Sequence, residues 1–187
     1  IAEDIGNFFP SVTDEKVFEI WRHFFRFSEP IARLLTRLTT KDGVLPQGAC
    51  TSPQLANLVF WRDEPVLQAK LASEGIVYSR FVDDVAVSSK TFISHEKKKE
   101  LVGAIYTLMQ RNGLKPKRVK HELMTRRDRM TVTKLTVNQK AGLSKKVRSQ
   151  IRAAVHRLEV AAPHESHIHN EFNSVLGKVN HMARFHP

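Results

Sequence analysis

The chain has 187 residues, of which 41% are hydrophobic, and this length suits one compact domain or slightly more. Its single cysteine, Cys50, excludes an intramolecular disulfide and any zinc site built from several thiolates. This cysteine usage predicts an intracellular protein. No apolar run approaches the roughly 20 residues that span a bilayer, so no membrane segment is expected.

The net charge of +11 is concentrated in one part of the chain. Residues 96–152 contain 17 Lys and Arg against 4 Asp and Glu, a net of +13, whereas the remainder has a net charge of −2. This asymmetry predicts a track for a polyanion such as nucleic acid. The alternative is that the lysine-rich runs are ordinary solvated surface.

The first quarter of the chain predicts a short strand followed by helices. Residues 1–5 have a strand-like apolar pattern, which residues 8–11 interrupt. A helix is expected from about Thr13, because acidic side chains follow in its first turn and apolar residues recur at helical spacing as far as Phe25. A short helix should follow Pro30, and the dipeptide Asp42-Gly43 predicts a hairpin turn.

The middle of the chain predicts a helix and then a hairpin. Ser52 is expected to cap a helix with Pro53 at its first position, and Pro65 should kink or interrupt this helix before it ends near Ser73. Two apolar runs then flank residues 81–84, which predicts a β-hairpin with two carboxylates at its tip.

The last part of the chain predicts two strands between helices. A helix from about 94 to 112 should end at Gly113. Strands are expected near 119–124 and 130–138. A basic helix capped by Ser144 and a final helix over about 170–184 complete the chain.

Three aspartates are the candidate catalytic groups. Asp4 ends the first strand, and Asp83 and Asp84 lie at the hairpin tip. Each alone is weak evidence, but adjacent carboxylates repel unless a cation offsets their charge, and neighbouring strands would bring all three together. Such a group can hold two divalent metals, which stabilise the attacking and leaving oxygens of phosphoryl transfer. Because successive strand residues face opposite ways, Asp83 is assigned the more direct role and Asp84 a supporting one.

The segment from Leu45 to Pro53 combines Gln47-Gly48 with the expected helix N-terminus at Ser52. Free backbone N–H groups at such a place attract phosphate or support a base-pair contact. The alternative is a plain loop-to-helix cap. Likewise, Ser79-Arg80-Phe81 has the pattern of a simple amphipathic edge.

These segments, in this order, resemble the palm of a reverse transcriptase. Asp4-Ile5-x-x-Phe8-Phe9 resembles its first catalytic motif, Gln47-Gly48-x-x-x-Ser52-Pro53 the second, and Phe81-Val82-Asp83-Asp84 the third, with Phe81 where the family usually has tyrosine. Gly113-Leu114 followed by Lys120 resembles the fourth, although Lys115, Lys117 and Arg118 compete for the position of its lysine. Residues 132–138 resemble a Val-Thr-Gly-Leu-x-Val-Asn segment of retron-type enzymes, with Lys134 in place of glycine.

The resemblance implies an α+β fold, a right-hand polymerase palm made of an antiparallel sheet backed by helices. Residues 1–11 and 45–139 would form the palm, 12–44 the second half of the fingers and 140–187 the start of a helical thumb. The first half of the fingers is expected upstream of Ile1. This piece alone is therefore expected to polymerise weakly or not at all.

The resemblance also implies an RNA-directed DNA polymerase that adds dNTPs to a primer 3′-hydroxyl. Asp4, Asp83, Asp84 and the Ile5 carbonyl would hold two Mg²⁺ ions, with Mn²⁺ as the alternative, and Lys120 would protonate the departing pyrophosphate. Phe9 would exclude a ribose 2′-hydroxyl, while Phe8 is expected in the core. Substrate contacts are expected from Gln47, Gly48, Ser52 and Pro53.

The expected partners are an RNA template, a DNA primer and product, and a structured non-coding RNA, in the bacterial cytoplasm and without a membrane. Retron-like enzymes rank first, ahead of group II intron and defence-associated antiviral relatives. The basic residues expected to contact nucleic acid are Lys115, Lys117, Arg118, Lys134, Lys145, Lys146, Arg148 and Arg152.

Two other functions remain open at this stage. The first is a catalytically silent palm that only binds RNA or DNA, and the intact aspartates argue against it. The second is an RNA-dependent RNA polymerase, and Phe9 together with Gln47-Gly48 argues against that.

Overall fold

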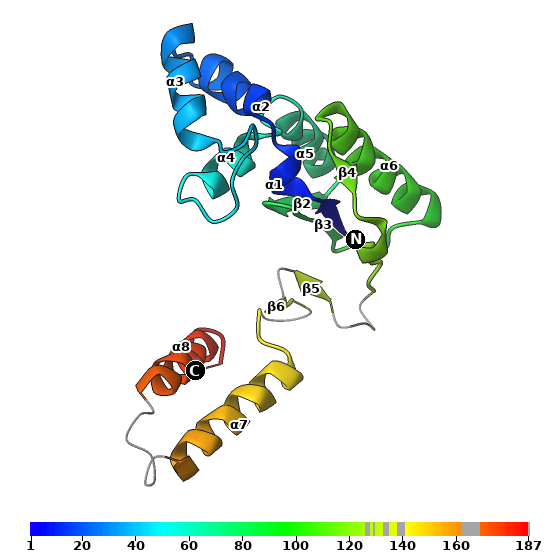
Figure 1. Cartoon of the computed structure of the whole chain (residues 1–187). Helices are drawn as coiled ribbons and strands as arrows, with labels where there is room; N and C mark the ends of the chain where they lie inside the picture. Colours follow the sequence, from blue (N-terminus) through cyan, green and yellow to red (C-terminus); the bar gives the residue numbers. More distant parts are fainter. Residues whose placement is uncertain (126–127, 129, 133–134, 138–140, 162–168, 187) are drawn as a thin grey trace. The chain divides into compact units, whose positions relative to one another are not determined.

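A computed structural model shows two compact units, Ile1–Leu123 and Met124–Pro187 (Figure 1). It describes residues 1–125, 128, 130–132, 135–137, 141–161 and 169–186. Within these ranges, no helix combines the length and apolar character that a membrane span requires.

The first unit is α+β, with its strands paired into one sheet and its helices between and after them. Its elements are β1 (Ala2–Gly6), α1 (Phe8–Ser11), α2 (Asp14–Glu19), the π-helical η1 (Ile20–Phe24), α3 (Glu29–Thr39), α4 (Ser52–Leu58), α5 (Glu64–Ser73), β2 (Ile76–Phe81), β3 (Asp84–Ser89), α6 (His95–Arg111), β4 (Lys115–Pro116) and the 3₁₀ turn η2 (Arg118–Lys120).

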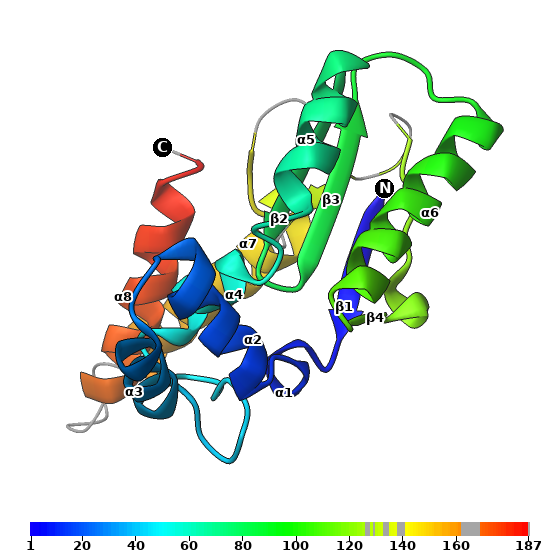
Figure 2. The ribbon, with the colours of Figure 1, turned by 90° about the horizontal axis from the view of Figure 1, so that it is seen from above.

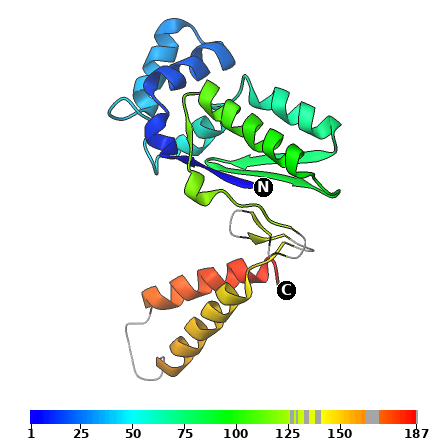
Figure 3. The same ribbon diagram turned by 90° about the vertical axis from the view of Figure 1, so that its right-hand side faces the viewer.

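The sheet has the strand order β2-β3-β1-β4, and each neighbouring pair is antiparallel (Figure 2). Helix α5 packs against β2, and α6 contacts β4. Both helices lie on the same side of the sheet (Figure 3). The predicted antiparallel sheet backed by helices is therefore confirmed.

Alternating burial along β2 and β3 shows which face of the sheet carries the core. Ile76, Tyr78, Val85 and Val87 are buried, whereas Val77 is 63% exposed. Since successive strand residues face opposite ways, the buried set lies under α5 and α6 and the other face is open. Helix α6 completes the core with buried Leu101, Ile105 and Met109, and the turn between α4 and α5 adds Phe60.

Two tight turns need a left-handed backbone. Asp42 and Gly43 have φ values of 53° and 76°, and they close the predicted hairpin turn between the paired residues Lys41 and Val44. Val82, in the β2–β3 turn, has a φ of 57°. A β-branched residue strongly disfavours this region, and strain of this kind costs of the order of 1–3 kcal/mol.

Several local expectations need correction. The helix from Thr13 is regular only as far as Glu19 and then widens into η1, where the amide of Phe25 donates to the Ile20 carbonyl at 3.1 Å. The interruption expected at Pro65 is confirmed, because α4 ends at Leu58 and α5 begins at Glu64.

The strand expected near 119–124 is wrong. Residues Arg118–Lys120 form η2 instead, and only Glu122 pairs with β1, through its bridge to Ala2. A run of β-compatible residues thus folds as a turn because one hydrogen-bonded bridge suffices to anchor it.

The second unit contains β5 (Thr131–Val132), β6 (Leu135–Thr136), α7 (Lys145–Ala161) and α8 (His169–Ala183). Short strands β5 and β6 pair with each other, so the single strand expected over 130–138 is wrong in its described part. Ser144 accepts a hydrogen bond from the Val147 amide at 3.3 Å, as predicted for a cap. Helices α7 and α8 pack together around Ile151, Ala154 and Val175.

Candidate functional site

The strand register brings the three candidate aspartates together. Asp4 of β1 lies directly opposite Asp84 of β3. One residue further along β1, the Ile5 amide donates to the Asp83 carbonyl at 3.0 Å. The end of β1 is therefore joined to the hairpin tip. A cation site shared by the three aspartates needs this arrangement.

Asp4 and Asp84 lie on the sheet face opposite α5 and α6, where Asp84 is exposed and Asp4 is buried, at 4% exposure. Their neighbours Glu3 and Val85 are also register partners, and both are buried. Glu3 accepts a hydrogen bond from the Tyr106 hydroxyl of α6 at 3.2 Å, so this pair lies on the helix side. Strand alternation then directs the two aspartates to the opposite face.

Lys120 supplies the positive charge that this acidic group needs. Its ammonium forms an ion pair with Asp4. The hydrogen bond to Asp4 raises the pKa of the Lys120 ammonium, and the charges of Asp4, Asp84 and Asp83 act in the same direction, while desolvation opposes them. The Lys120 side chain is 53% exposed, so it can leave this position without disturbing the core.

Backbone contacts hold the Lys120 segment beside β1. The Lys117 amide donates to the Asp4 carbonyl at 2.7 Å, and Ala2 and Glu122 exchange hydrogen bonds at 2.9 and 3.0 Å. The His121 ring also pairs with buried Glu3. Of the four basic residues considered for the fourth motif, Lys120 is therefore the one whose side chain meets a predicted catalytic residue.

The donor set fits a divalent metal. Its side-chain ligands would be three carboxylates, the hard oxygen donors that Mg²⁺ prefers, and a cation already lies against one of them. As they stand, the described residues contain no group of three or more His, Cys, Asp or Glu side chains arranged around a metal position. In this structure, the Asp4 carboxylate is turned to Lys120.

The predicted substrate-contact residues lie in two places. Phe9 is half-buried and packs edge-on against Phe8 at 5.7 Å between ring centroids, while Phe8 is in the core as predicted. Gln47 and Gly48 are exposed, and Gly48 has a φ of 95°.

Ser52 is not the helix cap that its sequence position indicated. Thr51 precedes the helix, and Ser52 is its first residue, followed by exposed Pro53. The buried Ser52 hydroxyl donates to the Pro46 carbonyl at 2.5 Å. A buried hydroxyl must find a partner, and this one ties the Gln47-Gly48 turn to α4.

The basic residues predicted to contact nucleic acid are mostly exposed. This holds for Lys115, Lys117, Arg118, Lys145, Lys146 and Arg152, whereas Arg148 is half-buried. Within the part of the chain that the structure describes, the Arg148 Nε is a buried donor without a partner. Lys134 lies outside the described residues.

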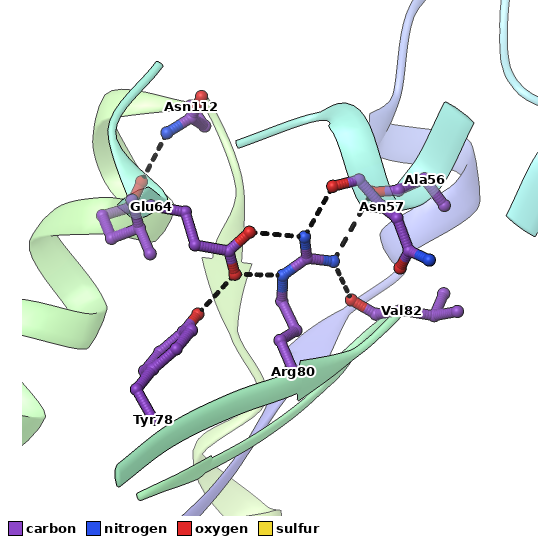
Figure 4. A network of polar contacts seen from close by, with 8 residues as sticks. Ala56, Asn57, Glu64, Tyr78, Arg80, Val82 and Asn112 are labelled. Carbon is purple, nitrogen blue, oxygen red and sulfur yellow. Dashed lines mark hydrogen bonds and ion pairs between the residues drawn. The ribbon is translucent and has the colours of Figure 1, made fainter. Parts of the chain in front are cut away.

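Sequence reasoning missed a buried polar network next to the aspartates (Figure 4). Arg80 has a side chain only 4% exposed and pairs with Glu64 at 2.6 Å. The interpretation of residues 79–81 as an amphipathic edge is therefore wrong at Arg80. The signal was present, because Ile76, Tyr78 and Arg80 alternate onto the same buried face of β2.

Comparison with known proteins adds independent information. No family model matches the chain. The retron Se72 reverse transcriptase of Salmonella heidelberg is 32% identical over 98% of this chain and 50% of its own length. The retron Ec86 reverse transcriptase of Escherichia coli is 30% identical over 83% of this chain and 48% of its own length. The retron Ec48 reverse transcriptase of the same species is 27% identical over 97% of this chain and 46% of its own length.

The chain thus spans about half the length of the curated relatives it matches. The similarity to the Se72 and Ec48 relatives runs through nearly all of the chain. By sequence, the chain is similar over most of its length to retron reverse transcriptases, at 27–32% identity, which supports a retron-like reverse transcriptase fragment.

Proposed function

We propose that the natural polypeptide carrying this sequence is an RNA-directed DNA polymerase that extends a primer 3′-hydroxyl with dNTPs. The observation that carries this proposal is the pairing of Asp4 with Asp84 beside the hydrogen bond from Ile5 to the Asp83 carbonyl. Three carboxylates carried by adjoining ends of the two central strands could supply what two-metal phosphoryl transfer requires of a protein. The names of the relatives support the polymerase class.

In this proposal, Asp4, Asp83, Asp84 and the Ile5 carbonyl hold two Mg²⁺ ions, or Mn²⁺ in their place. When bound, these ions supply the charge that stabilises the attacking and leaving oxygens of the phosphoryl group. The protein contributes position and electrostatics. Lys120, held protonated beside the aspartates, donates its proton to the departing pyrophosphate.

The remaining roles follow from side-chain size and charge. The half-buried ring of Phe9 excludes a ribose 2′-hydroxyl and so favours dNTPs. The Gln47-Gly48 turn, tied down by Ser52 and followed by Pro53, contacts the incoming base pair. The exposed basic residues of η2 and α7 follow the backbone of an RNA–DNA duplex.

The subdomain assignment belongs to the same proposal. Residues 1–11 and 45–139 form the palm, 12–44 part of the fingers, and 140–187 the start of the thumb. A structured non-coding RNA is a proposed partner in the bacterial cytoplasm, and antiviral defence is the proposed biological setting.

Primer extension by the natural polypeptide tests this function. On an RNA template, dNTPs should be incorporated in preference to rNTPs. Preferential use of rNTPs would favour an RNA polymerase instead. Binding of the primer–template without any incorporation would favour a catalytically silent palm.

The matched variants are Asp83→Asn and Asp42→Asn. Asp83→Asn should abolish synthesis and leave duplex affinity within about twofold, because the substitution removes a charge from the cation site without changing shape. Asp42→Asn changes an exposed left-handed turn that asparagine also tolerates, so both synthesis and affinity should persist. Retained synthesis in Asp83→Asn would remove Asp83 from the site.

A further inference from the structure

The guanidinium of Arg80 uses its complete set of hydrogen-bond donors inside the first unit (Figure 4). Nε and Nη2 donate to the two Glu64 carboxylate oxygens at 2.6 and 2.8 Å. Nη2 also donates to the Asn57 carbonyl at 2.9 Å. Nη1 donates to the Val82 carbonyl at 2.9 Å and to the Ala56 carbonyl at 3.5 Å. These five contacts match the five N–H groups of arginine, a number that lysine lacks.

The contact with Val82 holds the turn that carries the aspartates. Val82 has a left-handed φ of 57°, which valine rarely adopts, so the turn needs support from outside. Arg80 binds its carbonyl, and the Ile5 amide binds the next carbonyl, that of Asp83, at 3.0 Å. Two successive carbonyls of the turn are thus fixed, one by β2 and one by β1.

The other contacts of Arg80 join this turn to two helices. Ala56 and Asn57 lie in the last turn of α4, where a cation is favourable, and the Ala56 carbonyl also accepts a hydrogen bond from the Val59 amide at 3.4 Å. Glu64 is the first residue of α5, and it also accepts a hydrogen bond from the Tyr78 hydroxyl at 2.7 Å. The Arg80 guanidinium lies over the Phe60 ring, 4.7 Å from its centroid, which fixes its plane.

We infer that Arg80 is a positioning residue that sets the geometry of the Asp83-Asp84 turn and couples it to α4. Its role toward a cation rests on the proposed function, whereas its role in the turn does not. Arg80 touches no aspartate side chain in the contacts described above, so it would act through the Val82 carbonyl and not as a ligand.

Arg80→Lys is the test variant, and Arg62→Lys is its matched control. Arg62 also pairs with a glutamate, Glu19, and lies over an aromatic ring, that of Trp61, but its side chain is 54% exposed. Both variants keep the positive charge and lose the planar guanidinium with its five N–H donors. Only Arg80→Lys should change the turn.

Hydrogen exchange of backbone amides tests the stability of the turn without any metal. In Arg80→Lys, the Ile5 amide, which donates to Asp83, should exchange at least about fivefold faster than in the parent chain. The Val87 amide, which donates to the Ile1 carbonyl at the far end of the same strand pair, should keep its rate. An unchanged ratio of the two rates would overturn the inference.

The affinity for Mn²⁺, measured by electron paramagnetic resonance of the free ion, tests whether Arg80 also affects the aspartate carboxylates. Arg80→Lys should weaken Mn²⁺ binding about tenfold, and Arg62→Lys should not, because residues that orient ligands affect metal affinity on this scale. If the parent chain binds no Mn²⁺, the proposed cation site fails, and the exchange experiment still decides the role of Arg80. If the parent binds and Arg80→Lys binds equally well, the inference fails.

A rescue experiment separates positioning from general structural support. Glycine adopts the conformation of Val82 without strain, so Val82→Gly should make the arginine largely dispensable. The double variant Arg80→Lys/Val82→Gly should then bind Mn²⁺ within about threefold of Val82→Gly alone, a non-additive result. Full additivity would contradict the inference.

If Arg80→Lys does not fold, Glu64→Gln is the alternative variant. It removes the carboxylate charge that holds the Arg80 guanidinium, so the Ile5 amide should exchange faster, and an unchanged rate would overturn the inference.

Discussion

Lys120 balances the charge of the aspartates in the first unit. Its ammonium pairs with Asp4, and Asp83 and Asp84 also raise its pKa. A divalent ion bound by the same carboxylates would compete with this side chain. Lys120 and a bound metal would therefore meet the same Asp4 carboxylate.

Lys120→Met should make stability depend on divalent ions. Without the ammonium, the three carboxylates repel one another, so the urea midpoint in a chelator should fall below that of the parent chain. Added Mg²⁺ should restore it, because binding to the folded state stabilises that state. Lys117→Met, in the same segment, is the control and should show no such dependence. Equal midpoints for Lys120→Met with and without Mg²⁺ would contradict this expectation.

Tyr78 should make the first unit sensitive to alkaline pH. Burial raises the pKa of the Tyr78 hydroxyl above its ordinary value, and the neighbouring Glu64 carboxylate raises it further. The unfolded chain then loses this proton near pH 10 while the folded chain keeps it. The protonated Tyr78 hydroxyl therefore contributes its full share to the free energy of unfolding below about pH 10. This share is lost as the pH rises further, at up to about 1.4 kcal/mol per pH unit.

The Tyr78→Phe variant isolates this contribution. Its unfolding free energy should be lower by about 1 kcal/mol at pH 7, because the hydrogen bond to Glu64 is gone. Between about pH 10 and 11 it should fall less steeply than that of the parent chain. The free energy of unfolding is measured by denaturant titration at each pH. If it changes with pH equally in the parent chain and in Tyr78→Phe, Tyr78 ionises equally in the folded and unfolded states, which contradicts this prediction.

At the scale of the elements, two glycines with open space around them should respond oppositely to alanine. A Cβ on Gly43 or Gly103 would meet no atom within 4 Å. Gly43 has a φ of 76°, so Gly43→Ala should destabilise by about 1 kcal/mol through backbone strain alone. Gly103 lies inside α6, so Gly103→Ala should stabilise by about 0.5–1 kcal/mol. Urea denaturation measures both, and effects of the same sign would contradict this explanation.

Elements with local chemical signals could be predicted from the sequence. The Asp42-Gly43 turn and the Ser144 cap depend on residues within a few positions of each other, and both are confirmed. Elements decided by distant contacts were mispredicted. Residues Arg118–Lys120 form a turn beside the bridge between Glu122 and Ala2, and the Ser52 hydroxyl reaches the Pro46 carbonyl in place of capping α4.

The candidate site shows the same division. The sequence identified Asp4, Asp83 and Asp84 by residue type and order, but it could not decide which lysine meets them, because that depends on how residues 115–122 pack beside β1. Arg80 was overlooked for a related reason. Strand alternation places Arg80 on the buried face of β2, but its partners, the Glu64 side chain and the carbonyls of Asn57 and Val82, are set by tertiary packing.

At the scale of the whole molecule, the charge excess should appear as salt-sensitive binding to an RNA–DNA duplex. Exposed Lys145 and Lys146 begin α7 inside the basic segment. Changing both to glutamine should reduce the slope of log affinity against log salt by about 0.9 for each phosphate contact removed. Lys70→Gln, outside that segment and paired with Glu100, should leave the slope unchanged. Equal slopes for all three proteins would assign the binding to other residues.

The most direct test of the two-metal proposal is a crystal of the protein soaked in Mn²⁺ and measured for anomalous scattering. The expected result is one or two peaks at coordination distance from the carboxylate oxygens of Asp4 and the Asp83-Asp84 pair, roughly 2.1 Å for Mg²⁺ and slightly longer for Mn²⁺, with the Lys120 ammonium displaced. The result that would contradict it is Asp4 still paired with Lys120 in a well-ordered site that carries no anomalous peak at saturating Mn²⁺.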